Sequence, residues 1–504
     1  MTDLNLLRNL AAFTCACFDS LTKRVFLPVL IVSLNLLLTA RATAQTFTTL
    51  HSFTALDQTY YTNGDGRYPS CTLVLSGNVL YGTASGGGSS GNGTVFAVNT
   101  NGTGFTNLHS FTASDPNIGT NTDGTDPSGR LILSGNTLYG TAETGGNFGH
   151  GTVFAVNTNG TGFTTLHNFT AFDPDTGTNS DGFWPLGGLV LSGNTLYGTT
   201  YGGGSSGSGT VFAINTNGTD FRIVHNFTGS DGGVLVGLIL SGNTLYGTAE
   251  QGGSSGGGTV FAVNTDGTGF TNLYNFTAGS GSWPNITNSD GAVPSGVALS
   301  GNTLYGAADL GGSSGSGTLF ALNTDGTGFT NLHDFNGSSD GVNPGAGLIL
   351  SGNTLYGTAY NGGTYNNGTV FAVNTDGTGF TKLHSFTSGS AGAHPIGGLI
   401  LSGNTLFGTA FGGYNSGGDF SGNGTVFSIT LPSPPQLRII RSAGNVILSW
   451  PTNAAGLTFT LQSTTNLISA AGWNTVSPVS AVVSGQNTVT NPITGTQQFY
   501  RLSQ

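Results

Sequence analysis

The chain has 504 residues, of which 87 are glycine and 32 are phenylalanine, while only 7% are charged and a single one is methionine. This composition favours turns and aromatic strands, so we expect almost no helix in the mature protein. From residue 45 onward, 20 acidic residues stand against 7 Lys and Arg. That balance argues against nucleic acid as a partner, because phosphate neutralisation needs clustered cations.

The first 44 residues have the pattern of a signal peptide. Lys23 and Arg24 precede the apolar run 25–38, and Ala42-Thr43-Ala44 offers a cleavage site between small residues. An uncleaved anchor is the alternative, but the run is short for a bilayer span, which needs about 20 residues. We therefore expect export with cleavage, no membrane span afterwards, and a secreted or cell-surface location. The mature chain keeps only Cys71, so neither an internal disulfide nor a thiolate metal site can form.

Seven near-copies of the string Ser-Gly-Asn-x-Leu-(Tyr/Phe)-Gly follow at steps of 49 to 59 residues. This is the size of a propeller blade. Each unit contains four short alternating runs, which are typical of antiparallel strands joined in hairpins. In the third unit these runs are 188–191, 195–199, 210–215 and 221–227. The seven strings begin at Ser76, Ser134, Ser192, Ser241, Ser300, Ser351 and Ser402.

The two ends of the repeat region complement each other. Segment 47–53 has the sequence of a fourth strand but no preceding three, whereas the last unit stops after its third strand, 425–429. If the two pair, all seven sheets have four strands and no edge stays exposed. The sequence therefore predicts an all-β protein with a seven-bladed β-propeller over residues 45–431, closed by the N-terminal strand. A parallel β-helix is the alternative, but it does not explain the complementary ends.

The anchors of the third unit are Asp181-Gly182 with Pro185, Gly188-Leu189, residues 196–199, Gly202-Gly203, residues 209–212 and Phe227. In this order they resemble the GloVer tandem repeat of secreted bacterial proteins, and the resemblance covers residues 47–430. It implies export and a propeller-like array, and it carries no settled activity. Departures from the pattern include Leu235 in place of proline and Ala391 in place of aspartate.

The composition changes at the proline-rich segment 432–435, which we interpret as a linker. Residues 436–504 contain alternating runs that suggest a small β-sandwich resembling fibronectin type III modules. Trp450 and Trp473 are predicted core residues. The module resembles the C-terminal parts of exported bacterial proteins, which implies a spacer or surface attachment.

One face of the predicted ring is the candidate binding surface. The connections from each closing Phe to the next blade range from 8 to 18 residues, whereas the turns on the opposite face are nearly invariant. Length variation on one face is typical of recognition, although long polar loops also drift neutrally. On the same face, the residue two after Leu-(Tyr/Phe)-Gly-(Thr/Ala) differs from blade to blade. These residues are Ser85, Glu143, Tyr201, Glu250, Asp309, Tyr360 and Phe411.

Aromatic and acidic side chains together suit a carbohydrate or a cationic ligand. The alternative is an exposed strand end that tolerates any residue. We predict a monomeric, exported, non-enzymatic binding or surface-display protein that contacts a glycan or another extracellular partner. The candidate ligand-binding residues are Glu143, Tyr201, Glu250, Asp309, Tyr360 and Phe411. Two alternatives remain: a polysaccharide-active hydrolase or lyase using Glu143, Glu250 or Asp309, and a purely structural repeat array.

No cofactor is expected, apart from a weak candidate for Ca²⁺ in two long loops that carry oxygen side chains at alternate positions. These lack the bidentate glutamate of an EF-hand, and Asp-Gly turns explain them without a metal. The candidate Ca²⁺ ligands are Asp115, Asn117, Asp123, Asp173, Asp175 and Asp181. Histidines also recur at one place in the fourth run of six units, where Tyr274 replaces the seventh. Such repetition favours a role in packing over catalysis.

Overall fold

The computed structural model describes residues 45–57, 59, 61–281, 286–337, 339–412, 422–432, 437–442, 445–451, 460–464, 473–476, 480–483, 486–492 and 498–503. The predicted signal peptide and residues 433–435 of the predicted linker lie outside the described residues. Gln45–Leu431 form one compact unit, and the chain from Pro432 onward belongs to another. In the described part, the only helical element is the 3-10 turn η1 (Gly389–Ala391), and no helix is long and apolar enough to cross a membrane.

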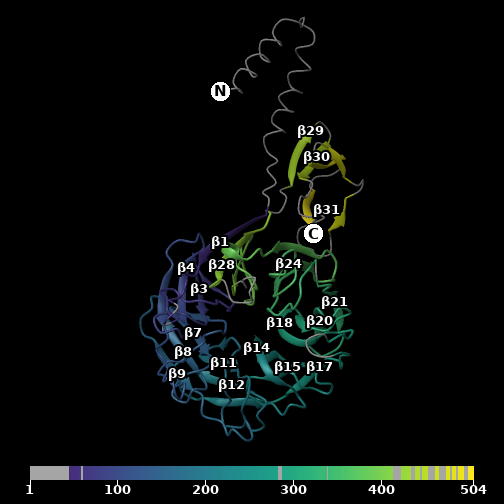
Figure 1. Ribbon diagram of the computed structural model, residues 1–504. Coiled ribbons are helices and arrows are strands. Elements are labelled where there is room, and N and C mark those ends of the chain that lie inside the picture. Colours follow the sequence, from purple (N-terminus) through teal and green to yellow (C-terminus); the bar gives the residue numbers. More distant parts are fainter. Residues whose placement is uncertain are drawn as a thin grey trace, which may run out of the picture. The chain divides into compact units, whose positions relative to one another are not determined.

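The first unit contains seven four-stranded antiparallel sheets, numbered here 1 to 7 in the order of the repeats (Figure 1). Sheet 1 consists of β2 (Val74–Ser76), β3 (Val79–Ala84), β4 (Thr94–Asn99) and β5 (Thr106–Ser110). Sheet 2 consists of β6 (Ile132–Ser134), β7 (Thr137–Ala142), β8 (Thr152–Asn157) and β9 (Thr164–Asn168). Sheet 3 consists of β10 (Val190–Ser192), β11 (Thr195–Thr199), β12 (Thr210–Asn215) and β13 (Arg222–Asn226). Sheets 4 and 5 consist of β14 (Gly233–Ser241), β15 (Thr244–Gln251), β16 (Thr259–Asn264), β17 (Thr271–Asn275); and β18 (Ala292–Ser300), β19 (Thr303–Leu310), β20 (Thr318–Asn323), β21 (Thr330–Asp334). Sheet 6 consists of β22 (Ile349–Ser351), β23 (Thr354–Ala359), β24 (Thr369–Asn374) and β25 (Thr381–Ser385).

Sheet 7 joins the two ends of the unit. It contains β26 (Ile400–Ser402), β27 (Thr405–Ala410), β28 (Thr425–Thr430) and the first strand of the chain, β1 (Thr46–Ser52). Strand β1 pairs antiparallel with β28, so that Phe47 lies opposite Ile429 and Ser52 lies opposite Thr425. The predicted pairing of the N-terminal strand is therefore confirmed. The antiparallel pairing within all seven sheets excludes the parallel β-helix.

The repeated string is explained by packing within each sheet. The last glycine of the string lies opposite a phenylalanine of the third strand, as Gly140 lies opposite Phe154. A Cβ atom at Gly140 would stand only 2.6 Å from the Cζ atom of that ring, so the ring can approach the second strand this closely only where the side chain is missing. The same close approach recurs in every repeat. The sequence repeats because each sheet uses the same close fit.

Seven buried apolar clusters join each sheet to the next, and the seventh joins sheet 7 to sheet 1. Aromatic stacking marks the same boundaries. The ring of the histidine or tyrosine in each fourth strand stacks on a phenylalanine of the following sheet, with centroids 3.7 to 4.0 Å apart. The series begins with His51 on Phe105 and ends with His384 on Phe47. The sheets therefore form a closed ring.

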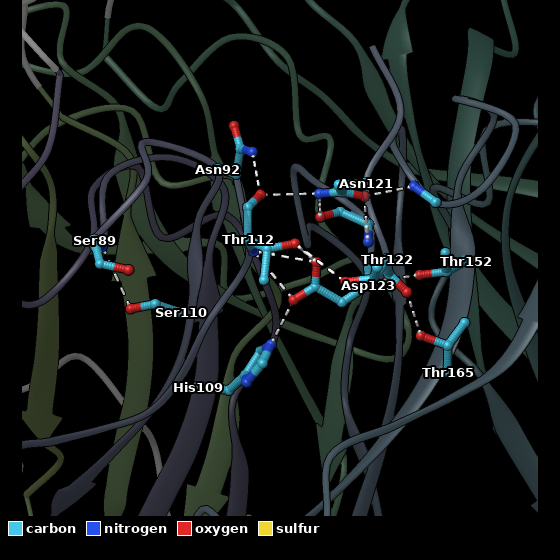
Figure 2. Close-up of polar contacts among 12 residues, drawn as sticks. Ser89, Asn92, His109, Ser110, Thr112, Asn121, Thr122, Asp123, Thr152 and Thr165 are labelled. Carbon is cyan, nitrogen blue, oxygen red and sulfur yellow. Dashed lines mark hydrogen bonds and ion pairs between the residues drawn. The ribbon is translucent and has the colours of Figure 1, made fainter. Parts of the chain in front are cut away.

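The recurring histidines and aspartates form a polar clamp between neighbouring sheets (Figure 2). His109 Nε2 lies 2.9 Å from Asp123, whose carboxylate also accepts hydrogen bonds from the backbone and hydroxyl of Thr112. The carbonyl of Asp123 accepts a hydrogen bond from Thr152 at the start of β8. One aspartate thus ties a fourth strand, its loop and the next sheet together. The equivalent pairs are His51–Asp65, His167–Asp181, His225–Asp231, Tyr274–Asp290 and His333–Asp340.

The clamp is incomplete at the boundary between sheets 6 and 7. Ala391 occupies the aspartate position, since its carbonyl accepts the hydrogen bond of Thr425 as the carbonyl of Asp123 accepts that of Thr152. Within the described residues, the buried Nε2 atom of His384 therefore has no hydrogen-bond partner. Burial lowers the pKa of His384 to about 4.

The C-terminal unit contains two small sheets. One has the order β29 (Arg438–Ser442), β30 (Asn445–Pro451), β34 (Gln486–Pro492), β33 (Ala481–Val483), and the other β32 (Asn474–Thr475), β31 (Thr460–Thr464), β35 (Phe499–Ser503). Trp450 is buried in a core that includes Leu448 of the first sheet and Leu461 of the second. Trp473, the other predicted core residue, is only half-buried, and the guanidinium of Arg501 lies 4.3 Å from the centre of its ring.

Candidate functional site

The antiparallel order of the strands gives the ring two chemically different faces. On one face lie the hairpins between second and third strands and the connections from one sheet to the next, and we call it the variable face. In the described part of 45–431, the exposed large apolar side chains all belong to these segments. They are Tyr61, Ile118, Phe148, Tyr365 and Ile396.

The opposite face repeats one turn. In sheet 2 the amide of Thr161 donates to the side chain of Asn159, and in sheet 6 the amide of Thr378 donates in the same way to Asp376. Such self-contained turns form without help from other segments. Differences in sequence between repeats and exposed apolar side chains are therefore concentrated on the variable face.

The predicted site residues share one place on the variable face. Ser85, Glu143, Tyr201, Glu250, Asp309, Tyr360 and Phe411 are all half-buried. Five of them donate a backbone hydrogen bond to a carbonyl at the start of the same sheet. Tyr201, for example, donates to Trp184 over 3.0 Å, and Tyr360 donates to Asn343 over 2.9 Å. In sheets 4 and 5 the strand register places Val234 opposite Glu250 and Val293 opposite Asp309, so each predicted residue has a second residue beside it.

These neighbouring residues form a second variable set, which the sequence analysis missed. Each precedes the proline, or Leu235, that leads into the first strand: Tyr68, Asp126, Trp184, Val234, Val293, Asn343 and His394. Their identities also change from repeat to repeat, and that was the signal available in the sequence. We call the two sets of seven together the rim.

Contacts along the rim pass from one sheet to the next. Asn343 of sheet 6 donates a hydrogen bond to the carbonyl of Asp309 in sheet 5 over 2.9 Å. The ring of His394 lies 4.7 Å from that of Tyr360, and the ring of Tyr68 stacks on Phe411 at 4.5 Å. The structure therefore brings Asp309, Tyr360 and Phe411 of the predicted site into one continuous band.

The backbone of the second set is left-handed. Their φ angles lie between 54° and 59°, whereas a residue before proline normally adopts an extended conformation. Only eleven residues other than glycine have a positive φ in the described part, and seven of them are these. A non-glycine residue in this region costs about 1–3 kcal/mol. Glycine would avoid that cost, and this glycine-rich chain uses it at none of the seven positions.

The rim carries carboxyl groups in two places. Burial and then the charge of Asp126 raise the pKa of Glu143 to about 7. Burial and then the charge of Asp309 raise the pKa of Glu250 to about 7, and burial alone raises the pKa of Asp309 to about 7. Within the described residues, the Oδ1 atom of Asp309 is buried without a hydrogen-bond partner. These groups change charge near neutral pH.

The candidate Ca²⁺ ligands take part in two different kinds of hydrogen-bonded structure. The carboxylates of Asp115 and Asp173 accept hydrogen bonds from the amides of Asn117 and Asp175 in exposed turns. Asp123 and the equivalent Asp181 are buried in clamps with histidine. In the part of the chain that the structure describes, no group of three or more His, Cys, Asp or Glu side chains could hold a metal ion.

A closed ring of seven four-stranded antiparallel sheets, with variable side chains gathered on one face, defines a β-propeller-like repeat protein. The chain matches the Gloeobacter/Verrucomicrobia repeat over residues 37–179, 170–293 and 285–458, and it belongs to this family. The family is the one that its motifs resemble. No curated protein matches the chain.

Solved structures with a similar arrangement are distant in sequence. An oligogalacturonate lyase in complex with manganese has 12% identity and a TM-score of 0.46, covering 77% of this chain and 98% of its own. An oligogalacturonate lyase from Vibrio parahaemolyticus has 11% identity and a TM-score of 0.44, covering 78% and 99%. The nidogen/laminin complex has 14% identity and a TM-score of 0.37, covering 61% and 93%.

Proposed function

We propose that this protein is an exported, non-enzymatic binding or surface-display protein, whose rim holds a glycan or another extracellular partner. In this proposal the repeats form a seven-bladed β-propeller closed by its N-terminal strand. A small C-terminal β-sandwich resembling fibronectin type III modules serves as a spacer or attachment. Export follows from the leader pattern of residues 1–44.

The backbone of the rim supports this function most directly. Side chains such as Trp184, Asn343 and Tyr68 are kept where glycine would fit with less strain. Scaffold positions of the same chain follow the opposite rule, since left-handed turns elsewhere are mostly glycine. Strain that is concentrated in a variable band is expected where the side chains themselves are needed for contact.

The chemistry of the rim suits a glycan. Aromatic side chains such as those of Trp184 and Tyr201 can pack against the apolar faces of sugar rings, and carboxyl groups accept hydrogen bonds from hydroxyls. Because the carboxyls of Glu143 and Glu250 have pKa values of about 7, they can also donate a hydrogen bond at neutral pH. A partner rich in hydroxyl groups uses both roles.

The test is a glycan array followed by calorimetric titration of the strongest ligand with the mature chain. Trp184→Gly and Tyr68→Gly each remove a rim aromatic while suiting the left-handed backbone. We expect each to weaken binding about tenfold or more, because aromatic anchors dominate most interfaces. Asp220→Gly is the matched control. Asp220 has a φ of 54° on the opposite face of sheet 3, where most other repeats have glycine. Equal binding by all three variants and the native chain would rule out the rim.

The carboxyl groups favour one second candidate, a polysaccharide-active hydrolase or lyase. A group with a pKa near 7 can act as a general acid or base at neutral pH, and burial places Glu143, Glu250 and Asp309 in that range. Such an enzyme would release shorter products from a polysaccharide panel, and Glu143→Gln or Glu250→Gln would abolish the release. Unchanged polysaccharides after long incubation with the native chain favour binding alone.

A further inference from the structure

A pocket lies on the variable face between sheets 3 and 4. It has a volume of about 380 Å³, and its lining includes Phe183, Trp184 and Tyr201 from sheet 3 and Val234 and Gln251 from sheet 4. This volume is at the lower end of the range of small-molecule sites, roughly 300–1,000 Å³. We call this site the aromatic pocket.

The aromatic wall of the pocket is held in place from behind. The ring of Trp184 lies 5.7 Å from that of Tyr201, inclined by 55°. Phe183 meets Trp184 edge-on at 5.0 Å, and Phe172 lies 4.5 Å behind Phe183. Trp184 is further constrained by its left-handed backbone, with a φ of 55°, directly before Pro185. A wall fixed in this way loses little conformational freedom when a ligand binds.

Both aromatic residues of this pair come from one sheet. Sheet 3 is the one sheet whose two rim positions both carry Trp, Tyr or Phe, whereas sheet 1, for example, pairs Tyr68 with Ser85. The remaining lining supplies glycines, Ser208 and the exposed side chain of Gln251. A glutamine amide both donates and accepts hydrogen bonds, as a sugar hydroxyl does. No residue that lines the pocket carries a formal charge.

We infer that the aromatic pocket binds the pyranose ring of an uncharged hexose residue, with one face of the sugar on Trp184 and Tyr201 and its hydroxyls toward Gln251. The apolar C–H face of a pyranose packs against an aromatic ring, while its rim of hydroxyls needs polar partners at the side. A uronic acid or an amino sugar would find no opposite charge there. The inference rests on the proposed function and names the ligand class for one part of the rim.

The experiment measures sugar binding to the mature chain by calorimetric titration, a readout that does not depend on Trp184. The probes are glucose, galactose and mannose, their β-1,4- and α-1,4-linked oligomers, glucuronate and glucosamine. Concentrations reach about 10 mM, so that dissociation constants up to about 1 mM can be measured. We expect saturable binding of at least one neutral oligomer, and weaker or no binding of the charged sugars.

The variants Trp184→Ala, Tyr201→Ala and Gln251→Ala should each weaken that binding, the first two about tenfold or more. Trp184→Phe should restore part of it, and this keeps the test valid if the alanine variant unfolds. Tyr365→Ala is the matched control, since Tyr365 is an aromatic residue of the variable face that is 59% exposed and does not line the pocket. It should bind as the native chain does.

Two results would overturn the inference. One is that no neutral sugar in the panel binds, and the other is that binding is the same in Trp184→Ala and Tyr201→Ala as in the native chain. The proposed function is judged separately. If an array ligand depends on Tyr68 but not on Trp184, the rim binds a glycan and the aromatic pocket does not. If no array ligand depends on any rim residue, the proposed function itself is wrong.

Discussion

The incomplete clamp between sheets 6 and 7 can be completed by Ala391→Asp. The backbone of Ala391 already lies where the other repeats place aspartate, as the hydrogen bond from Thr425 to its carbonyl indicates. A carboxylate there would accept hydrogen bonds from the buried Nε2–H of His384 and from Thr387, the counterpart of Thr112 in the complete clamp of Figure 2. The change should therefore stabilise the native state, and by an amount that depends on pH.

The magnitude follows from the pKa of His384, which burial lowers to about 4 from an ordinary value of 6.5. Because the native value is depressed, the native state binds fewer protons than the unfolded chain, so its stability is full above pH 6.5 and falls as the pH drops toward 4. At pH 5 this difference costs about 2 kcal/mol. A carboxylate beside the ring raises the pKa and removes most of that cost.

Ala391→Asp should therefore raise the melting temperature more at pH 5 than at pH 8. For a domain of this length, 2 kcal/mol corresponds to a difference of roughly 2–3 °C. At pH 8 only the gain from satisfying the buried Nε2–H of His384 remains, about 1–3 kcal/mol, reduced by the desolvation of the new carboxylate. Differential scanning calorimetry at both pH values measures the two gains, and NMR titration follows His384 directly.

Ala391→Asn is the control, since its amide oxygen accepts the same hydrogen bond without a charge. It should give a similar gain at pH 8 but no extra gain at pH 5. If Ala391→Asp gives equal shifts at the two pH values, or if the pKa of His384 stays near 4, the explanation of the clamp is wrong.

Three further predictions concern the scaffold and the rim. Asp123→Ala leaves His109 and Thr112 without their acceptor and should lower the free energy of unfolding in urea by about 3 kcal/mol, whereas Asp123→Asn should keep part of the stability. A loss below about 0.5 kcal/mol would contradict the role of the clamp. Gly140→Ala should cost about 1–3 kcal/mol in the same assay, because its methyl group collides with the ring of Phe154, and an unchanged midpoint would refute the close fit. Since the native pKa of Asp309 is raised to about 7, its contribution to stability is full below pH 4 and is lost as the pH rises through 7. Asp309→Asn should therefore raise the melting temperature more at pH 8 than at pH 5, and equal shifts at the two pH values would show that the carboxyl is not buried.

The sequence allowed the strands of the third repeat to be predicted to within about two residues, because alternation and glycine-rich turns act locally. The pairing of β1 with β28 was also predictable, since each end of the repeat region lacked what the other supplied. Because the same pattern occurs seven times, a strand boundary that is ambiguous in one repeat can be read from the others. The strands of the scaffold could therefore be predicted from the sequence.

The second set of rim residues was missed, although its variation from repeat to repeat was visible in the sequence. A residue before proline is expected to be extended, so nothing local suggested that Trp184 or His394 would turn into the band beside Tyr201 and Phe411. The clamp was missed for a related reason: its partners are 14 residues apart in His109–Asp123 but 6 apart in His225–Asp231. Both features depend on how the closed ring positions neighbouring sheets, and this position is the same whether the connection between two sheets is long or short.

The pairing of β1 with β28 also sets the order of biogenesis. Thr46 lies opposite Thr430, so the first strand to leave the ribosome must wait for nearly the whole chain before it finds its partner. Six sheets can assemble while the chain is being synthesised, but sheet 7 cannot. The ring therefore closes only after the residues of β28 have been synthesised.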